Sequence, residues 1–210
     1  MLEGIKPLYS SILRPLVKLL IKIKIHPNII TFMGVVLFII AAGLSIAARW
    51  REALGFLILG ALMDGLDGLL ARESGKTSDF GAILDSSCDR ITEIALLMGL
   101  LVYYINSTDF GNYSAYLCFT ALAGSVMVSY VKARCEGAGI SCSRGILQRP
   151  ERLILIALGF LLGPDAMVWI LALTTLLSVV TVVERLVVAF IACRQTSEKH
   201  IQLADSPAQN

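Results

Sequence analysis

The sequence predicts an all-α integral membrane protein, with about six transmembrane helices preceded by an interfacial amphipathic helix. Hydrophobic residues make up 56% of the chain and charged residues only 16%, and the mean hydropathy is +0.76. This composition lies outside the range of soluble proteins. A chain of 210 residues holds about six spans of roughly 20 residues each, which leaves no room for a separate soluble domain.

Residues 1–28 are expected to form the interfacial helix. Apolar residues lie along one side of this segment, and Arg14, Lys18 and Lys22 follow one another at intervals of four on the other side. A basic amphipathic helix of this kind lies in the plane of the membrane surface.

Residues 29–194 are expected to form the six-helix transmembrane catalytic domain. Lys and Arg gather in the first helix, the 72–76 loop and the 132–152 segment. The positive-inside rule places these segments and both termini in the cytoplasm, which implies a multi-pass protein of the plasma membrane. Residues 195–210 are polar and are expected to be disordered. The expected spans are 29–48, 53–72, 80–105, 113–131, 153–162 and 166–193.

Four aspartates lie within or beside these apolar runs. Asp64 and Asp67 are three residues apart, and Asp85 and Asp89 are four residues apart, so each pair projects from one face of a helix. An acid at the bilayer centre costs at least ~2.5 kcal/mol, which makes such residues functional candidates. Carboxylate oxygens are hard ligands that favour Mg²⁺, Mn²⁺ or Ca²⁺, and four carboxylates suit two metal ions. A purely structural role would leave negative charge in excess over the neighbouring arginines.

Small residues and one cation surround the acids. The small residues would let a ligand approach the helices closely, and the arginine would bind phosphate. The 73–79 loop would form a mobile mouth. The residues concerned are Gly68, Ala71, Arg72, Gly75, Ser78 and Gly81.

This stretch resembles the signature of the CDP-alcohol phosphotransferases. The family pattern is matched without departure at Asp64, Asp67, Gly68, Ala71, Arg72, Gly81, Asp85 and Asp89. The resemblance implies a homodimeric membrane enzyme that binds a CDP-linked donor, commonly CDP-diacylglycerol, and uses two divalent metal ions, Mg²⁺ or alternatively Mn²⁺.

The resemblance also implies roles for individual residues. Asp64, Asp67 and Asp85 would be the principal metal ligands. Asp89 would complete the metal site and accept the proton of the acceptor hydroxyl, and CMP would leave. The nucleotide pocket would be lined by Gly68, Ala71, Arg72, Gly75, Ser78 and Gly81, with a weaker local match at Pro27, Asn28 and Thr31.

The cations in the later helices indicate what kind of acceptor substrate the protein uses. Lys132 and Arg134 close the fourth span, and Arg149 and Arg152 open the fifth. Arg185 lies inside the sixth span, where an arginine is costly unless it faces a polar cavity. Such a cluster suits an acceptor that carries its own phosphate. Positive-inside topology and snorkelling to lipid phosphates are the alternative explanation.

The segments 129–136 and 149–152, together with Arg185, resemble the prokaryotic branch that makes phosphatidylinositol-phosphate from inositol 1-phosphate. By this resemblance Lys132, Arg134, Arg152 and Arg185 would hold the inositol phosphate. Phosphatidylglycerol-phosphate synthases, which use glycerol 3-phosphate, remain an alternative. A cation transporter with intramembrane carboxylates is the alternative of another class. We expect membrane lipids and no nucleic acid as partners.

Overall fold

The computed structural model describes residues 6–108, 111–142 and 145–204, and within them all regular secondary structure is α-helical. The helices are α1 (Lys6–Lys22), α2 (Pro27–Ile46), α3 (Trp50–Glu73), α4 (Asp79–Asn106), α5 (Gly111–Gly137), α6 (Arg149–Leu162) and α7 (Pro164–Ala204). The predicted all-α class is therefore confirmed.

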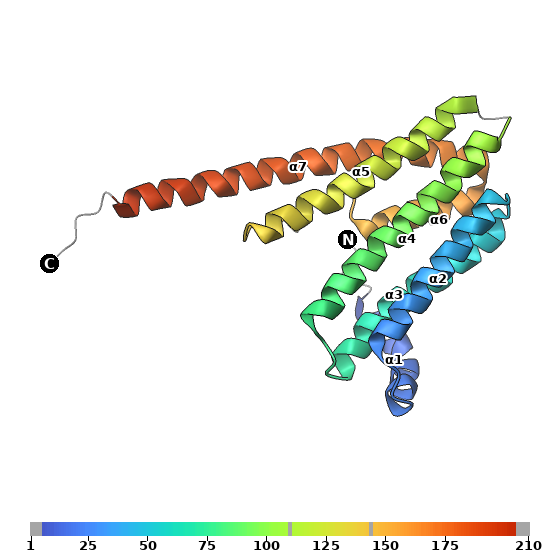
Figure 1. The fold of residues 1–210 in the computed structure, drawn as a ribbon, viewed down its shortest axis with the longest axis horizontal. Coiled ribbons are helices and arrows are strands. Elements are labelled where there is room, and N and C mark those ends of the chain that lie inside the picture. The colour runs from blue at the N-terminus through green and yellow to red at the C-terminus, as the bar shows by residue number, and fades with distance from the viewer. Residues whose placement is uncertain (1–5, 109–110, 143–144, 205–210) are drawn as a thin grey trace.

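The helices form two neighbouring groups (Figure 1). In the first group α2 packs against both α3 and α4, and α1 packs against α3. In the second group α7 packs against α5 and α6. Contacts of α4 with α5 and of α3 with α6 join the two groups.

The main core lies where the two groups meet, and it contains Phe38, Leu100, Ile156 and Phe160, all fully buried. Helix α4 approaches α2 closely at Gly99, where an added Cβ would lie 2.6 Å from the carbonyl oxygen of Ala42. A second cluster, which includes Val17 of α1 and Leu70 of α3, fastens α1 to the bundle.

Four of the described helices are long and apolar enough to cross a membrane. They are 27–46, 50–73, 112–137 and 164–195. Large apolar side chains such as Phe32, Trp169 and Phe190 are well exposed on these helices, as expected of surfaces that face lipid. These features support a membrane protein.

The structure corrects the expected end of the helical domain. Helix α7 continues to Ala204, so residues 195–204 are helical and not disordered as predicted. Residues 205–210 lie outside the described part. The sequence from 165 to 204 contains no Gly or Pro, so no helix breaker follows the apolar span.

Candidate active site

Three of the predicted aspartates converge between α3 and α4. One carboxylate oxygen each from Asp64, Asp85 and Asp89 lies within 4.8 Å of the other two. Helix α2 packs against both α3 and α4, and this arrangement lets carboxylates from two helices face one another. The i, i+4 spacing of Asp85 and Asp89 keeps both on the same face of α4.

The fourth aspartate, Asp67, has a different environment. Its side chain is buried and accepts a hydrogen bond from the hydroxyl of Thr31 on α2. It lines a small cavity with Asp85, beside the three-carboxylate cluster. The structure thus places all four acids in one region, and Asp85 both belongs to the cluster and lines the small cavity.

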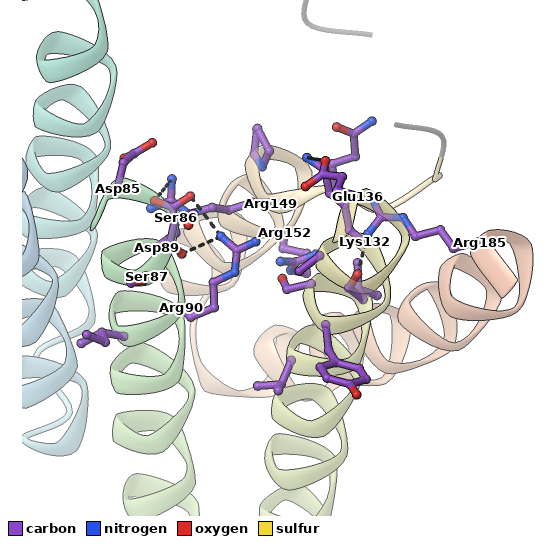
Figure 2. A pocket seen from close by; sticks show the side chains of 18 residues that line it. Asp85, Ser86, Ser87, Asp89, Arg90, Lys132, Glu136, Arg149, Arg152 and Arg185 are labelled. Atoms are coloured by element: carbon purple, nitrogen blue, oxygen red, sulfur yellow. Dashed lines mark hydrogen bonds and ion pairs between the residues drawn. The ribbon is translucent and has the colours of Figure 1, made fainter. Parts of the chain in front are cut away.

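Arg149, at the start of α6, is the main cation of the cluster (Figure 2). Its Nη1 lies 2.8 Å from Oδ1 of Asp89, which Figure 2 labels, and 2.7 Å from Oδ2 of Asp64. Arg90 is a second partner of Asp89, at 3.4 Å. Sequence reasoning noted Arg149 among the cations at the start of the fifth span but did not place it with the acids.

The cluster could hold a divalent metal ion. Its donors are all carboxylate oxygens, which are the ligands that Mg²⁺ and Mn²⁺ prefer. The guanidinium of Arg149 bridges two of the three acids, which shows that the cluster attracts positive charge.

The small cavity, of about 190 Å³, gathers most of the predicted nucleotide-binding residues. Its wall includes Pro27, Asn28, Thr31, Gly68, Ala71, Arg72, Ser78 and Gly81. Gly75 is exposed and does not line it. Ser78 shapes the cavity by capping α4, since its hydroxyl accepts a hydrogen bond of 3.0 Å from the N–H of Gly81.

Gly68 makes room for the cation of this cavity. A Cβ added to Gly68 would lie 3.4 Å from Nη1 of Arg72, so the guanidinium lies across the glycine. The small residue and the arginine of the motif therefore form one surface. This surface is suited to a phosphate that approaches the backbone closely.

A second cavity, of about 760 Å³, opens on the other side of Asp85 and Asp89 (Figure 2). Helices α4, α5, α6 and α7 all contribute to its wall. The cations that line it include Arg90, Lys132, Arg149, Arg152 and Arg185. Arg134 is exposed and is not among the lining residues.

Arg152 differs from the other lining cations because it forms a fully buried ion pair. It is 1% exposed, its Nε donates to Oε1 of Glu93, and its Nη2 donates to Oε2 of Glu93 at 2.9 Å. Its Nη1 donates to the carbonyl of Leu147 at 3.1 Å. The predicted acceptor ligand is thus tied to α4 and to the segment before α6.

Arg185 lines the large cavity from α7. Its side chain is buried and reaches from α7 to α5, where Nη1 donates to the carbonyl oxygen of Val128 (Figure 2). Lys132 lies near it on α5 and pairs with Glu136 at 3.7 Å. Cations of α5, α6 and α7 thus surround one cavity that has carboxylates at its edge.

A family comparison agrees with this geometry. The model of the CDP-alcohol phosphatidyltransferases matches residues 24–194, which include both cavities and the acid cluster. The chain belongs to this family. The family predicted from the aspartate motif is therefore confirmed, and the chain is a metal-dependent phosphatidyltransferase.

Several CDP-alcohol phosphatidyltransferases are similar over most of the chain. A phosphatidylinositol phosphate synthase of Corynebacterium glutamicum is 37% identical over 201 residues, covering 90% of this chain and 88% of the relative. The Mycobacterium tuberculosis synthase is 32% identical over 190 residues, with 85% of each chain covered. An archaetidylinositol phosphate synthase of Pyrococcus horikoshii is 36% identical over 157 residues, covering 74% and 80%.

Solved structures of the Mycobacterium tuberculosis phosphatidylinositol phosphate synthase share the fold. The form with CDP-diacylglycerol bound aligns with a TM-score of 0.78 at 30% identity, covering 84% of this chain and 92% of that one. The complex with manganese and citrate also has a TM-score of 0.78, with 84% and 88% covered.

Proposed function

We propose that this phosphatidyltransferase transfers the phosphatidyl group of CDP-diacylglycerol to inositol 1-phosphate, giving phosphatidylinositol-phosphate and CMP. The observation that carries the proposal is the position of Asp89. It belongs to the acid cluster and also lines the large cavity, whose other walls carry Lys132, Arg149 and Arg185. The relatives named as phosphatidylinositol phosphate synthases support the choice of acceptor.

The donor would occupy the small cavity and the acid cluster. Arg72 and the small residues around it would receive the cytidine diphosphate group, with Pro27, Asn28 and Thr31 on the facing helix. Asp64, Asp67, Asp85 and Asp89 would hold two divalent metal ions. These ions would neutralise the diphosphate and stabilise the charge that develops on the leaving group.

The acceptor would approach from the large cavity. Its hydroxyl oxygen would form a bond to the phosphorus that carries diacylglycerol, and the bond from that phosphorus to the CMP oxygen would break. Asp89 would accept the hydroxyl proton, because its carboxylate faces the cavity from which the acceptor comes.

The acceptor phosphate would be held by Lys132, Arg149 and Arg185. A free inositol or another neutral acceptor has no charge to match these three cations. Arg152 would contribute through the residues it positions, because its buried guanidinium already donates from all three nitrogens, to Glu93 and to the carbonyl of Leu147. Arg134, which is exposed and does not line the cavity, would have no direct part.

The membrane arrangement belongs to the same proposal. Helix α4, of 28 residues, is about 42 Å long and exceeds the hydrocarbon thickness of about 30 Å. The aspartates of α4 make the first half of this helix polar. Helix α6, of 14 residues, covers roughly 21 Å, which is shorter than the hydrocarbon thickness, and would complete a six-helix bundle as a short span. The active site would face the cytoplasm, where the basic segments lie.

Two further features complete the arrangement. Arg14, Lys18 and Lys22 are exposed on α1 next to the exposed Leu19 and Ile23, which suits a helix lying at an anionic membrane surface.

The homodimer expected from the family resemblance is also part of the proposal, and native mass spectrometry of the detergent-solubilised protein tests it.

An acceptor panel tests the proposed reaction. The purified protein is incubated with CDP-diacylglycerol, Mg²⁺ and one of inositol 1-phosphate, glycerol 3-phosphate, free inositol or serine, and CMP release is measured. We expect the highest kcat/KM with inositol 1-phosphate. A preference for glycerol 3-phosphate would replace the proposed acceptor. No CMP release with any acceptor would contradict the proposed reaction.

A further inference from the structure

Residues 145–148, which lead into α6, lie between two cations of the large cavity. At Gly145 the φ angle is +151°, a backbone conformation that favours glycine. A Cβ added there would lie 2.8 Å from Cγ2 of Thr181 and 3.3 Å from Nε of Arg185. The 145–148 segment therefore lies directly against α7, where it contacts Thr181 and Arg185, which are one helical turn apart.

Both backbone polar groups of Leu147 are used to fix this segment. Its N–H donates to the hydroxyl oxygen of Thr181 at 3.1 Å, and its carbonyl accepts from Nη1 of Arg152 at 3.1 Å. The Thr181 hydroxyl donates in turn to the carbonyl of Leu177 at 2.8 Å. Thr181 and Leu147 are buried, so water is not a ready substitute for these bonds.

The hydrogen-bond network around Leu147 reaches the proposed active site at both of its ends. On the α7 side, Arg185 follows Thr181 by four residues and so lies on the same helical face. On the α6 side, Arg149 follows the segment directly and bridges Asp64 and Asp89. The network thus joins a residue of the acceptor cavity to a residue of the acid cluster.

We propose that Thr181 is a positioning residue for the acceptor. By binding the N–H of Leu147, it fixes the 145–148 segment on α7 and thereby sets the position of Arg185 relative to Arg149. The inference rests on the proposed function, in which these two cations hold the acceptor phosphate. A small displacement of either cation weakens a bidentate contact to phosphate without affecting the donor cavity.

The test compares Thr181→Val, which removes the hydroxyl at nearly constant volume, with Thr181→Ser, which keeps it. Thr174→Val is the matched control, because Thr174 is also buried on α7 but its hydroxyl has no hydrogen-bond partner among the described residues. Measurements are the KM values for inositol 1-phosphate and CDP-diacylglycerol, the Tm, and the Kd for inorganic phosphate by titration calorimetry.

We expect Thr181→Val to raise the acceptor KM and the phosphate Kd about tenfold, as for the loss of one buried hydrogen bond. The donor KM should stay within about twofold. Thr181→Ser and Thr174→Val should behave like the unaltered protein. A lower Tm with an unchanged acceptor KM and phosphate Kd, or an equal rise in both KM values, would overturn the proposal.

A second variant covers the case in which Thr181→Val does not fold. Gly145→Ala places a Cβ against Thr181 and Arg185 and so pushes the segment away from α7. This variant should also weaken phosphate binding, whereas unchanged phosphate binding would overturn the proposal. Failure of the proposed function is seen separately, since the unaltered protein would then release no CMP with inositol 1-phosphate. The phosphate Kd values would still decide the role of Thr181.

Discussion

The Glu93–Arg152 ion pair gives a stability prediction that can be worked out from the structure. The two side chains are 4% and 2% exposed, and three guanidinium nitrogens of Arg152 are engaged. Replacing one partner, by Glu93→Leu or Arg152→Met, leaves the other charge buried without compensation. We expect each single change to lower the free energy of unfolding by about 3–5 kcal/mol.

The double variant, Glu93→Leu with Arg152→Met, should be much less destabilised than either single one. An apolar pair of similar volume needs no neutralising partner, so its stability should return to within about 1 kcal/mol of the unaltered protein. The assay is equilibrium unfolding in mixed micelles, followed by helical circular dichroism, for all members of the double-mutant cycle. The exposed pair Arg49–Glu52, with an N–O distance of 2.6 Å, serves as the control cycle and should show far weaker coupling.

Additive losses would contradict a coupled Glu93–Arg152 pair. If the double variant loses the sum of the two single losses, the pair is not coupled and Arg152 is not neutralised by Glu93. A single change without effect would likewise show that the charge reaches solvent. In both cases Arg152 would again be available as a direct ligand of the acceptor phosphate.

Further predictions concern the site and the membrane surface. Asp89→Asn should abolish CMP release while leaving CDP-diacylglycerol binding within about threefold, because the donor also contacts the small cavity; equal loss of both would show that Asp89 acts chiefly as a metal ligand. Arg185→Ala should raise the acceptor KM at least about tenfold with little change in kcat, and an effect on the donor KM alone would misplace the acceptor pocket. Changing Arg14, Lys18 and Lys22 together to Gln should reduce activity on anionic vesicles relative to neutral ones; unchanged lipid dependence would contradict the interfacial role of α1.

The local part of the site could be predicted from sequence because it depends on short spacings. Asp85 and Asp89 share a face of one helix whatever the remaining fold is. The motif residues around Gly68 and Gly81 converge because the connection between α3 and α4 is short. The small cavity therefore contains nearly the whole predicted nucleotide-binding set.

The long-range pairings could not be predicted in this way. Arg149 meets Asp64 across 85 positions of sequence and Arg152 meets Glu93 across 59, so each pairing depends on how α6 returns to the bundle. Several cations were candidates for each acid, and the spacing pattern does not choose among them. For the same reason the sequence did not separate the paired Arg152 from the other cations of the cavity.

Helix orientation limited the prediction for α5. Lys132 and Arg134 are two positions apart and so point to different sides of a helix. Only the packing of α5 on α4 and α7 decides that Lys132 lines the cavity and Arg134 does not. The end of α7 was missed because polar composition was given more weight than the absence of Gly and Pro between residues 165 and 204.

We propose that the aspartate cluster between the two cavities holds the metal that enables phosphatidyl transfer. Asp85 tests it most directly, since it belongs to the cluster and lines both cavities. Mn²⁺ binding, followed by the electron paramagnetic resonance of the free ion, is measured beside CMP release for the unaltered protein and Asp85→Asn. We predict that Asp85→Asn weakens Mn²⁺ binding at least about tenfold and that CMP release is lost with it. CMP release at the original rate, in this variant or in the presence of EDTA, would contradict the account.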